Sequence, residues 1–119
     1  MLKHLGLGVT RGQILENPIV NLPAAIRDPR GSIEMLFQGP SESVFFMRSR
    51  SGSVRAEHVH STDSHLCFVL TGSLLYLWRE RGSTLPPKQV AIAQDQAFFT
   101  PPNVEHSMIF TDLTDMIVI

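Results

Sequence analysis

Short stretches rich in hydrophobic, aromatic and β-branched residues follow one another along the chain after residue 30. Gly, Pro, Ser and Asn separate these stretches, as is typical of strands joined by turns. No stretch keeps a helical period over three turns. The pattern predicts strands at 33–37, 44–50, 54–60, 66–70, 74–79, 89–93, 97–100, 107–110 and 116–119. Strands at this spacing favour an all-β sandwich or barrel.

The first 30 residues have a different character, because glycines and prolines interrupt them at a density that breaks helices and strands. We expect a short edge strand at Ile19–Val20, one helical turn at 22–26 and a tight turn at 28–31. The predicted organisation is an irregular N-terminal arm at 1–30, packing on the barrel or on a partner, and a barrel at 31–119.

Composition narrows the class of protein. The 119 residues allow one domain, and 10 basic against 11 acidic residues argue against nucleic-acid binding. Apolar runs are too short for a membrane span, and the N-terminus does not resemble a signal peptide. The only cysteine, Cys67, has no partner for an internal disulfide, so we expect a reducing, cytoplasmic location.

Histidines carry the candidate chemistry. His58 and His60 are two residues apart, so on a strand both point to one face and both imidazoles can converge on one ion. His65 follows a polar turn and opens the next predicted strand, and His106 follows a Pro-Pro-Asn turn. His4, in the arm, has no comparable neighbours.

The spacing of these residues resembles a known pair of motifs. The first comprises Gly52, His58, His60, His65 and Gly72, and the second comprises Asp95, Pro101, Asn103 and His106. Both resemble the two motifs of the cupin superfamily, with His65 in place of the usual Glu. Asp95 and Asn103 stand where the family has Gly, and Phe110 where it has Asn; Asp and Asn tolerate the left-handed backbone that such turns need.

The cupin resemblance implies a small antiparallel jelly-roll barrel with a site inside its mouth. It also implies that His58, His60, His65 and His106 bind a divalent transition metal, with His65 either as the fourth ligand or as a hydrogen-bond donor behind a three-histidine site. Four neutral imidazoles suit zinc, iron, nickel or copper rather than magnesium or manganese. The alternative is a metal-free site whose histidines transfer protons or line a ligand pocket.

A narrower resemblance points to sugar-nucleotide cupins. It is carried by the segments Asp-Pro-Arg-Gly-Ser-Ile at 28–33, Val-Arg-Ala-Glu-His-Val-His at 54–60 and Phe-Thr-Pro-Pro-Asn-Val-Glu-His at 99–106. Ala56 stands where this group usually has Gly. The group contains deoxysugar 3,5-epimerases and 3,4-ketoisomerases, which act without metal, and a reductase domain whose similar site binds zinc.

Such isomerases need a base near the carbon beside a ketone and an acid that returns the proton. His58 or His60 is the candidate base, since imidazole titrates near working pH. Tyr76, the only tyrosine, is the candidate acid, with packing against Trp78 as its alternative role.

Two further features have open interpretations. The basic residues Arg48, Arg50 and Arg55 can contact a diphosphate or form a solvated edge strand. Cys67 shares the predicted inward face with His65, and a buried structural thiol is the expected role.

Three functions remain open at this point. The favoured one is a metal-binding cupin that acts on or binds a small carbohydrate-related molecule, with isomerase or epimerase chemistry. The others are a metal-dependent oxygenase of a small acid or thiol, and a non-catalytic module that binds a small ligand or metal. We also expect a homodimer, because the arm holds too few apolar residues for a core of its own.

Overall fold

A computed structural model describes residues 9–39, 43–59 and 62–119 of the chain. One short helix precedes the strands. The elements are α1 (Arg11–Glu16), β1 (Ile19–Val20), β2 (Ile26–Asp28), β3 (Gly31–Ile33), β4 (Phe45–Ser49), β5 (Val54–His58), β6 (His65–Thr71), β7 (Ser73–Glu80), β8 (Lys88–Ala93), β9 (Ala97–Thr100), β10 (Val104–Phe110) and β11 (Thr114–Val118). Among the described residues, no helix is long and apolar enough to cross a membrane.

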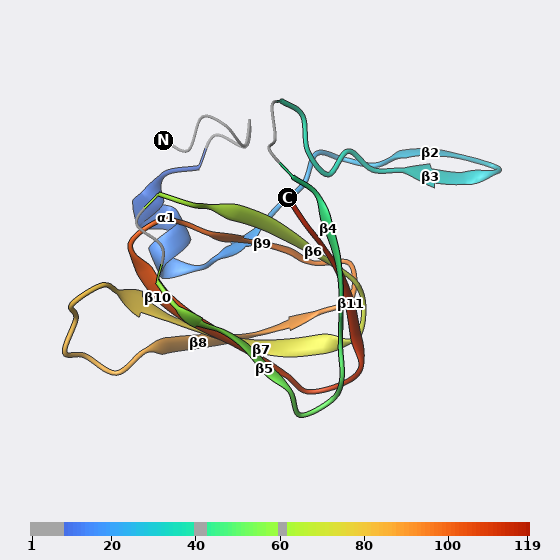
Figure 1. Ribbon diagram of the computed structural model, residues 1–119. Coiled ribbons are helices and arrows are strands. Elements are labelled where there is room, and N and C mark those ends of the chain that lie inside the picture. The colour runs from blue at the N-terminus through green and yellow to red at the C-terminus, as the bar shows by residue number, and fades with distance from the viewer. Residues whose placement is uncertain (1–8, 40–42, 60–61) are drawn as a thin grey trace.

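Two antiparallel sheets face each other and form the barrel (Figure 1). One sheet has the strand order β1-β9-β6-β11-β4 and the other the order β5-β10-β7-β8. Strands β2 and β3 form a separate two-stranded hairpin that projects from the barrel (Figure 1). The predicted all-β jelly-roll is confirmed.

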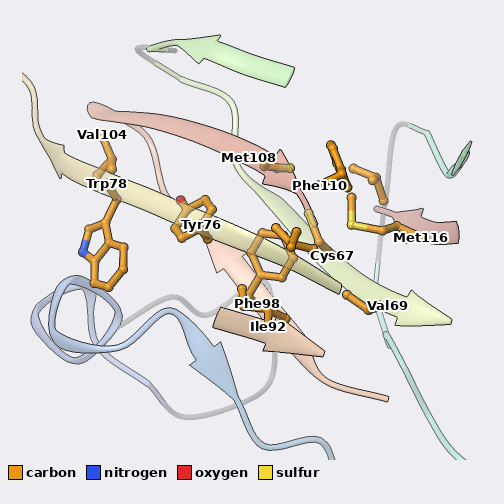
Figure 2. Packing of buried hydrophobic residues seen from close by; sticks show 12 residues of the cluster. Cys67, Val69, Tyr76, Trp78, Ile92, Phe98, Val104, Met108, Phe110 and Met116 are labelled. Carbon is orange, nitrogen blue, oxygen red and sulfur yellow. The ribbon is translucent and has the colours of Figure 1, made fainter. Parts of the chain in front are cut away.

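The main core fills the space between the two sheets (Figure 2). Strand β10 alternates between buried and half-buried residues along its whole length, as expected for a strand with one face on the core. Met108 and Phe110 share this inward face with His106. The largest side chains between the sheets are aromatic, and they include Tyr76, Trp78 and Phe98.

A second apolar cluster lies on the outer face of the five-stranded sheet. Phe68, Ala97 and Val20 belong to it, and one row of strand pairing joins them. The chain's own N-terminal segments cover this part of the sheet, with Ile14 buried and Leu36 half-buried in the cluster. The arm thus serves as the outer layer of the sheet over β9 and β6.

Three non-glycine residues in the described part of the chain have a left-handed backbone, two at turns and one at a bulge. Asp95 and Asn103 have φ angles of 68° and 60°, so the tolerance expected of Asp and Asn in these turns is confirmed. Ala56, with φ 61°, lies in β5 where the register with β10 shifts from His58 to Arg55. Gly adopts this left-handed conformation at a bulge without strain, which accounts for the Gly usual at this position in the sugar-nucleotide cupins that the segment resembles.

The N-terminal region differs from its prediction in two ways. A helical turn was expected at 22–26, but residues 21–25 form no regular structure. Helix α1 was not predicted, although Thr10 and Gln13 form a capping box that satisfies the first backbone amides. Six residues are too few for a hydrophobic period to be detected, so the capping signature was the only readable signal.

Candidate functional site

A row of strand pairing brings two of the predicted histidines together. His106 on β10 is the register partner of His58 on β5 and, on its other side, of Trp78 on β7. Side chains directly opposite on neighbouring strands are about 5 Å apart at Cβ, close enough to share an ion or a ligand. The side chain of His58 is outside the described part of the structure, as are His60 and His4 entirely.

The His106 ring is buried and held in one orientation. It is 8% exposed, and its Nδ1 lies 3.1 Å from the backbone carbonyl oxygen of Val104. When Nδ1 carries the proton and donates to this carbonyl, Nε2 is the basic nitrogen of the ring. A backbone contact of this kind is typical of histidines that bind a metal or accept a proton.

Tyr76 is next to this histidine in the barrel interior. Its ring centroid lies 6.0 Å from that of His106 and 5.6 Å from that of Trp78, with which it stacks. Figure 2 shows Tyr76 and Trp78 projecting from the same strand. The Tyr76 side chain is 1% exposed, and its hydroxyl has no hydrogen-bond partner within the described residues. Burial, reinforced by the Cys67 thiol, raises the pKa of Tyr76 above its ordinary value, so the hydroxyl stays protonated.

His65 comes from the opposite sheet. It opens β6 and pairs with Thr100, the last residue of β9. The turn after Thr100 leads directly to Val104, the first residue of β10, so His65 and His106 are at the same end of the barrel. The described residues contain no group of three or more metal-binding side chains, and they include only His65 and His106 in full from the predicted set of four.

Helix α1 packs over this end of the barrel. The Trp78 indole donates a hydrogen bond of 2.8 Å to the carbonyl oxygen of Leu15. Arg11 forms an ion pair of 2.8 Å with Glu80 and donates to the carbonyl oxygen of Pro102 at 3.3 Å. Leu15 itself packs against the main core. Sequence reasoning missed this cover because it missed the helix.

The predicted arginines have local partners. Arg48 contacts Asp115 with hydrogen bonds of 2.7 and 3.2 Å, and this contact lowers the pKa of the Asp115 carboxyl. Arg55 donates to the Ser49 hydroxyl at 2.9 Å. Both arginines therefore brace β4 against its neighbours, and Arg50 is exposed at the end of β4.

Cys67 is a free thiol in the main core. Burial raises its pKa to about 12, so the thiol is neutral and unreactive at physiological pH. Its place among the interior side chains is visible in Figure 2.

A surface hollow of about 480 Å³ lies beside the histidine end of the four-stranded sheet. Leu77, Arg79, Glu105 and Ser107 alternate with the interior residues along β7 and β10, so the hollow opens on the outer face of this sheet, and the interior residue His106 also borders it. The lining residues are Val59, Leu77, Arg79, Pro87, Glu105, His106 and Ser107. An ion pair between Arg79 and Glu105 crosses it.

The proteins found to be similar to this chain are solved structures with the same fold. No family model and no curated protein matches the sequence. A TDP-quinovose 3,4-ketoisomerase from Campylobacter jejuni is 19% identical, with a TM-score of 0.72 over 85% of this chain and 81% of its own. A 3,4-ketoisomerase from Helicobacter canadensis is 18% identical, with a TM-score of 0.70 over 84% of this chain and 78% of its own.

An epimerase has the same architecture. The dTDP-4-dehydrorhamnose 3,5-epimerase from Sulfolobus tokodaii is 21% identical, with a TM-score of 0.63 over 82% of this chain and 65% of its own. The chain therefore spans slightly less than two thirds of that epimerase and about four fifths of the ketoisomerases. These likenesses confirm the jelly-roll fold that the resemblance to the two cupin motifs implied.

Proposed function

We propose that the chain is an isomerase or epimerase of a nucleotide-linked keto sugar. The observation that carries this proposal is the buried, unpartnered hydroxyl of Tyr76 beside the oriented imidazole of His106. A hydroxyl that stays neutral and has no partner among the described residues is suited to donate a proton or hydrogen bond to a bound ligand. Two similar structures of a 3,4-ketoisomerase from Thermoanaerobacterium thermosaccharolyticum are complexes with TDP and with TDP-4-keto-6-deoxyglucose.

The chemistry requires only proton transfers. A basic imidazole, from His58 or His60, removes the proton from the carbon beside the ketone, and the electron pair moves onto the carbonyl oxygen. Tyr76 donates toward the charge that forms there, and a proton then returns to the opposite face or to the neighbouring carbon. The first route inverts one centre, and the second exchanges ketone and alcohol. Neither route changes the oxidation state of the molecule as a whole.

The test is turnover of TDP-4-keto-6-deoxyglucose in deuterated buffer, followed by proton NMR. We expect exchange at the carbon beside the ketone and accumulation of an isomer. His58→Asn and His60→Asn should separate the roles of the two candidate bases, and the base should lose about 100-fold or more in rate. His4→Asn is the matched control, since His4 is outside both motifs. Binding without exchange or isomerisation in the wild-type protein contradicts the proposal.

A metal-binding role is the second candidate. The Nδ1 contact of His106 with the Val104 carbonyl is typical of metal-binding histidines, and the pairing of His106 with His58 brings two imidazole donors to adjacent strands. These two observations support a site in which His58, His60, His65 and His106 would hold a zinc, iron, nickel or copper ion. Such an ion supplies Lewis-acid polarisation of a ligand oxygen. Within this site His106 would be the ligand whose orientation the backbone sets.

Metal content decides between the two candidates. We would measure it by inductively coupled plasma mass spectrometry on protein purified without nickel resin or chelators. A near-stoichiometric metal that is lost in His58→Ala and His106→Ala, and kept in His4→Ala, supports the metal site. Protein that neither contains nor takes up metal contradicts it. Turnover that survives chelation then supports the acid–base mechanism alone.

We also propose that the chain works as a homodimer in the cytoplasm. The free, buried Cys67 is compatible with a reducing compartment. The projecting hairpin of β2 and β3 supports the dimer, since an isolated hairpin is marginally stable in water.

A further inference from the structure

The hydroxyl of Tyr76 lies too deep in the barrel for a ligand to touch it while every element stays in place. The side chain is 1% exposed, and its oxygen is buried. The rings of Trp78, Phe98 and His106 lie around it, with centroids 5.1 to 6.0 Å from that of Tyr76. The proposed acid can therefore act on a ligand only if some part of the structure moves aside.

Helix α1 is the part of the described structure that can move most easily. The side chains of the main core, and those packed against it, all belong to strands of the two barrel sheets except Leu15 of α1. Backbone hydrogen bonds join the strands to their neighbours, whereas among the described residues every hydrogen bond between α1 and the barrel involves a side chain. Segments with few buried contacts and few backbone bonds open at the lowest cost in free energy.

A small set of contacts holds α1 over the histidine end of the barrel. The Trp78 indole donates to the Leu15 carbonyl oxygen, which lies in the last turn of the helix, where carbonyl groups have no partner within the helix. The side chains of the ion pair between Arg11 and Glu80 are 38% and 61% exposed, and exposed ion pairs contribute little to stability. Ile14 is the buried residue of the helix. These contacts are strong enough to close the helix over the barrel and weak enough to open.

The surroundings of α1 leave room for it to swing outward. Asn17, directly after the helix, has an extended backbone. From Pro18 onward the chain is fixed in the sheet, because the Phe99 amide donates to the Pro18 carbonyl oxygen at 2.9 Å. Rotation at Asn17 therefore lifts the helix and leaves β1 paired. A hollow of about 340 Å³ lies between α1, the end of β7 and the loop after it, and its lining includes Gly12, Leu15, Trp78, Leu85 and Pro86.

We propose that α1 is a lid over the histidine end of the barrel, and that a ligand reaches Tyr76 only when this lid lifts away from Trp78. In Figure 2 the Trp78 ring extends from β7 toward the blue coil of α1. The inference rests on the proposed isomerase function and assigns the gate of its site. When the lid closes again, the indole bonds to Leu15, and Leu15 packs on the core. Closure thus keeps water away from the proton transfers.

The first test measures opening of the lid without any ligand. Ile14→Cys places a thiol where the wild-type side chain is 2% exposed, so iodoacetamide can alkylate it only while the lid is lifted. Peptide mass mapping distinguishes this thiol from the native Cys67. Adding Arg11→Ala should raise the alkylation rate about two- to fivefold, because it removes an ion pair that only the closed lid makes. Arg27→Ala is the matched control, since Arg27 is exposed on the projecting hairpin of β2 and β3.

Hydrogen exchange in β10, measured by mass spectrometry on the same proteins, separates opening of the lid from unfolding of the barrel. The Arg11→Ala change should leave this exchange at the rate of its parent protein. Equal alkylation rates with Arg11→Ala and Arg27→Ala overturn the lid. An increase of β10 exchange by the same factor as alkylation also overturns it, because the helix then opens only together with the whole barrel.

The second test locks the lid. In a protein with Arg11→Cys and Glu80→Cys, a short bismaleimide reagent should link two positions whose wild-type side chains are 2.8 Å apart. The linked protein should turn over TDP-4-keto-6-deoxyglucose at least about tenfold more slowly than the same protein capped with N-ethylmaleimide. Unchanged turnover after linking overturns the lid. If the wild-type protein shows no turnover, the proposed function fails, and the alkylation rates decide on their own whether α1 opens.

Discussion

Replacing Tyr76 with Phe should make the protein more stable and less active. The hydroxyl has no partner among the described residues, and an unsatisfied buried polar group costs about 1–3 kcal/mol. Phe keeps the ring contacts with Trp78 and Phe98, whose centroids lie 5.6 and 5.1 Å away. We therefore expect the free energy of unfolding to rise by about 1 kcal/mol, equivalent to a Tm increase of about 4 °C.

The same substitution removes the proposed proton donor. A positioned acid contributes about 100- to 10,000-fold to a rate, so turnover of the keto sugar should fall by at least the lower factor. Urea unfolding followed by Trp78 fluorescence gives the stability, and NMR of the sugar gives the rate. A gain in stability together with a loss of activity is the signature of a group kept for function rather than for folding.

Thr114→Val is the matched control. The buried Thr114 hydroxyl accepts from the Ser73 amide at 3.1 Å and lies within hydrogen-bond distance of two carbonyl oxygens, those of Ser73 and Asp112. Its removal should cost about 1–3 kcal/mol and leave the activity of the folded protein unchanged. If Tyr76→Phe instead behaves like Thr114→Val, the Tyr76 hydroxyl has a structural partner, and the assignment as an acid is wrong.

Three further predictions concern backbone and burial. Ala56→Gly should raise the free energy of unfolding by about 0.5–1 kcal/mol in thermal or urea unfolding, because a φ of 61° strains Ala more than Gly. A decrease would show that the contact of the Ala56 methyl group with the core outweighs the backbone strain. Gly72→Ala should lower the free energy of unfolding by at least about 2 kcal/mol more than Gly82→Ala. Both glycines have positive φ, but of the two only Gly72 is placed so that a Cβ would meet other backbone atoms, the nearest at 2.4 Å. Equal losses of stability in the two variants would refute this. Burial raises the pKa of Cys67 in the folded protein to about 12, above its unfolded value, so the unfolded chain loses the thiol proton first as the pH rises. The contribution of Cys67 to the free energy of unfolding is complete below about pH 9 and should fall by up to ~1.4 kcal/mol per pH unit above pH 9. Urea unfolding of Cys67→Ala over the same pH range should show a shallower slope.

The barrel could be predicted because its strands obey local rules. In β10, alternation alone identifies the inward set of His106, Met108 and Phe110, and turn residues mark both ends of the strand. The left-handed turns at Asp95 and Asn103 were expected for the same local reason. The first strand was harder to predict, because 33–37 has the composition of a strand, whereas β3 covers Gly31–Ile33 and pairs only within the hairpin.

The candidate site could be predicted only in part, because its parts come from different elements. Spacing indicated that His58 and His106 belong to matching motifs, and the register of β5 and β10 makes them neighbours. Spacing carried no information on the cover by α1 or on the unpartnered hydroxyl of Tyr76, since both depend on tertiary packing. The roles of His58, His60, His65 and His106 as metal ligands or bases stay predictions.

The architecture separates the proposed chemistry from the proposed assembly. The row from His58 to Trp78 belongs to the four-stranded sheet, and His106 in that row faces the barrel interior. The row from Phe46 to Phe68 belongs to the other sheet and faces outward. Alternate residues of a strand point to opposite faces, so a substitution in the second row leaves the first in place. Phe46 is 57% exposed on that outer face, so Phe46→Asp should weaken association of the proposed homodimer without changing the turnover of each folded chain. A loss of turnover in this variant would show that the partner contributes to the site.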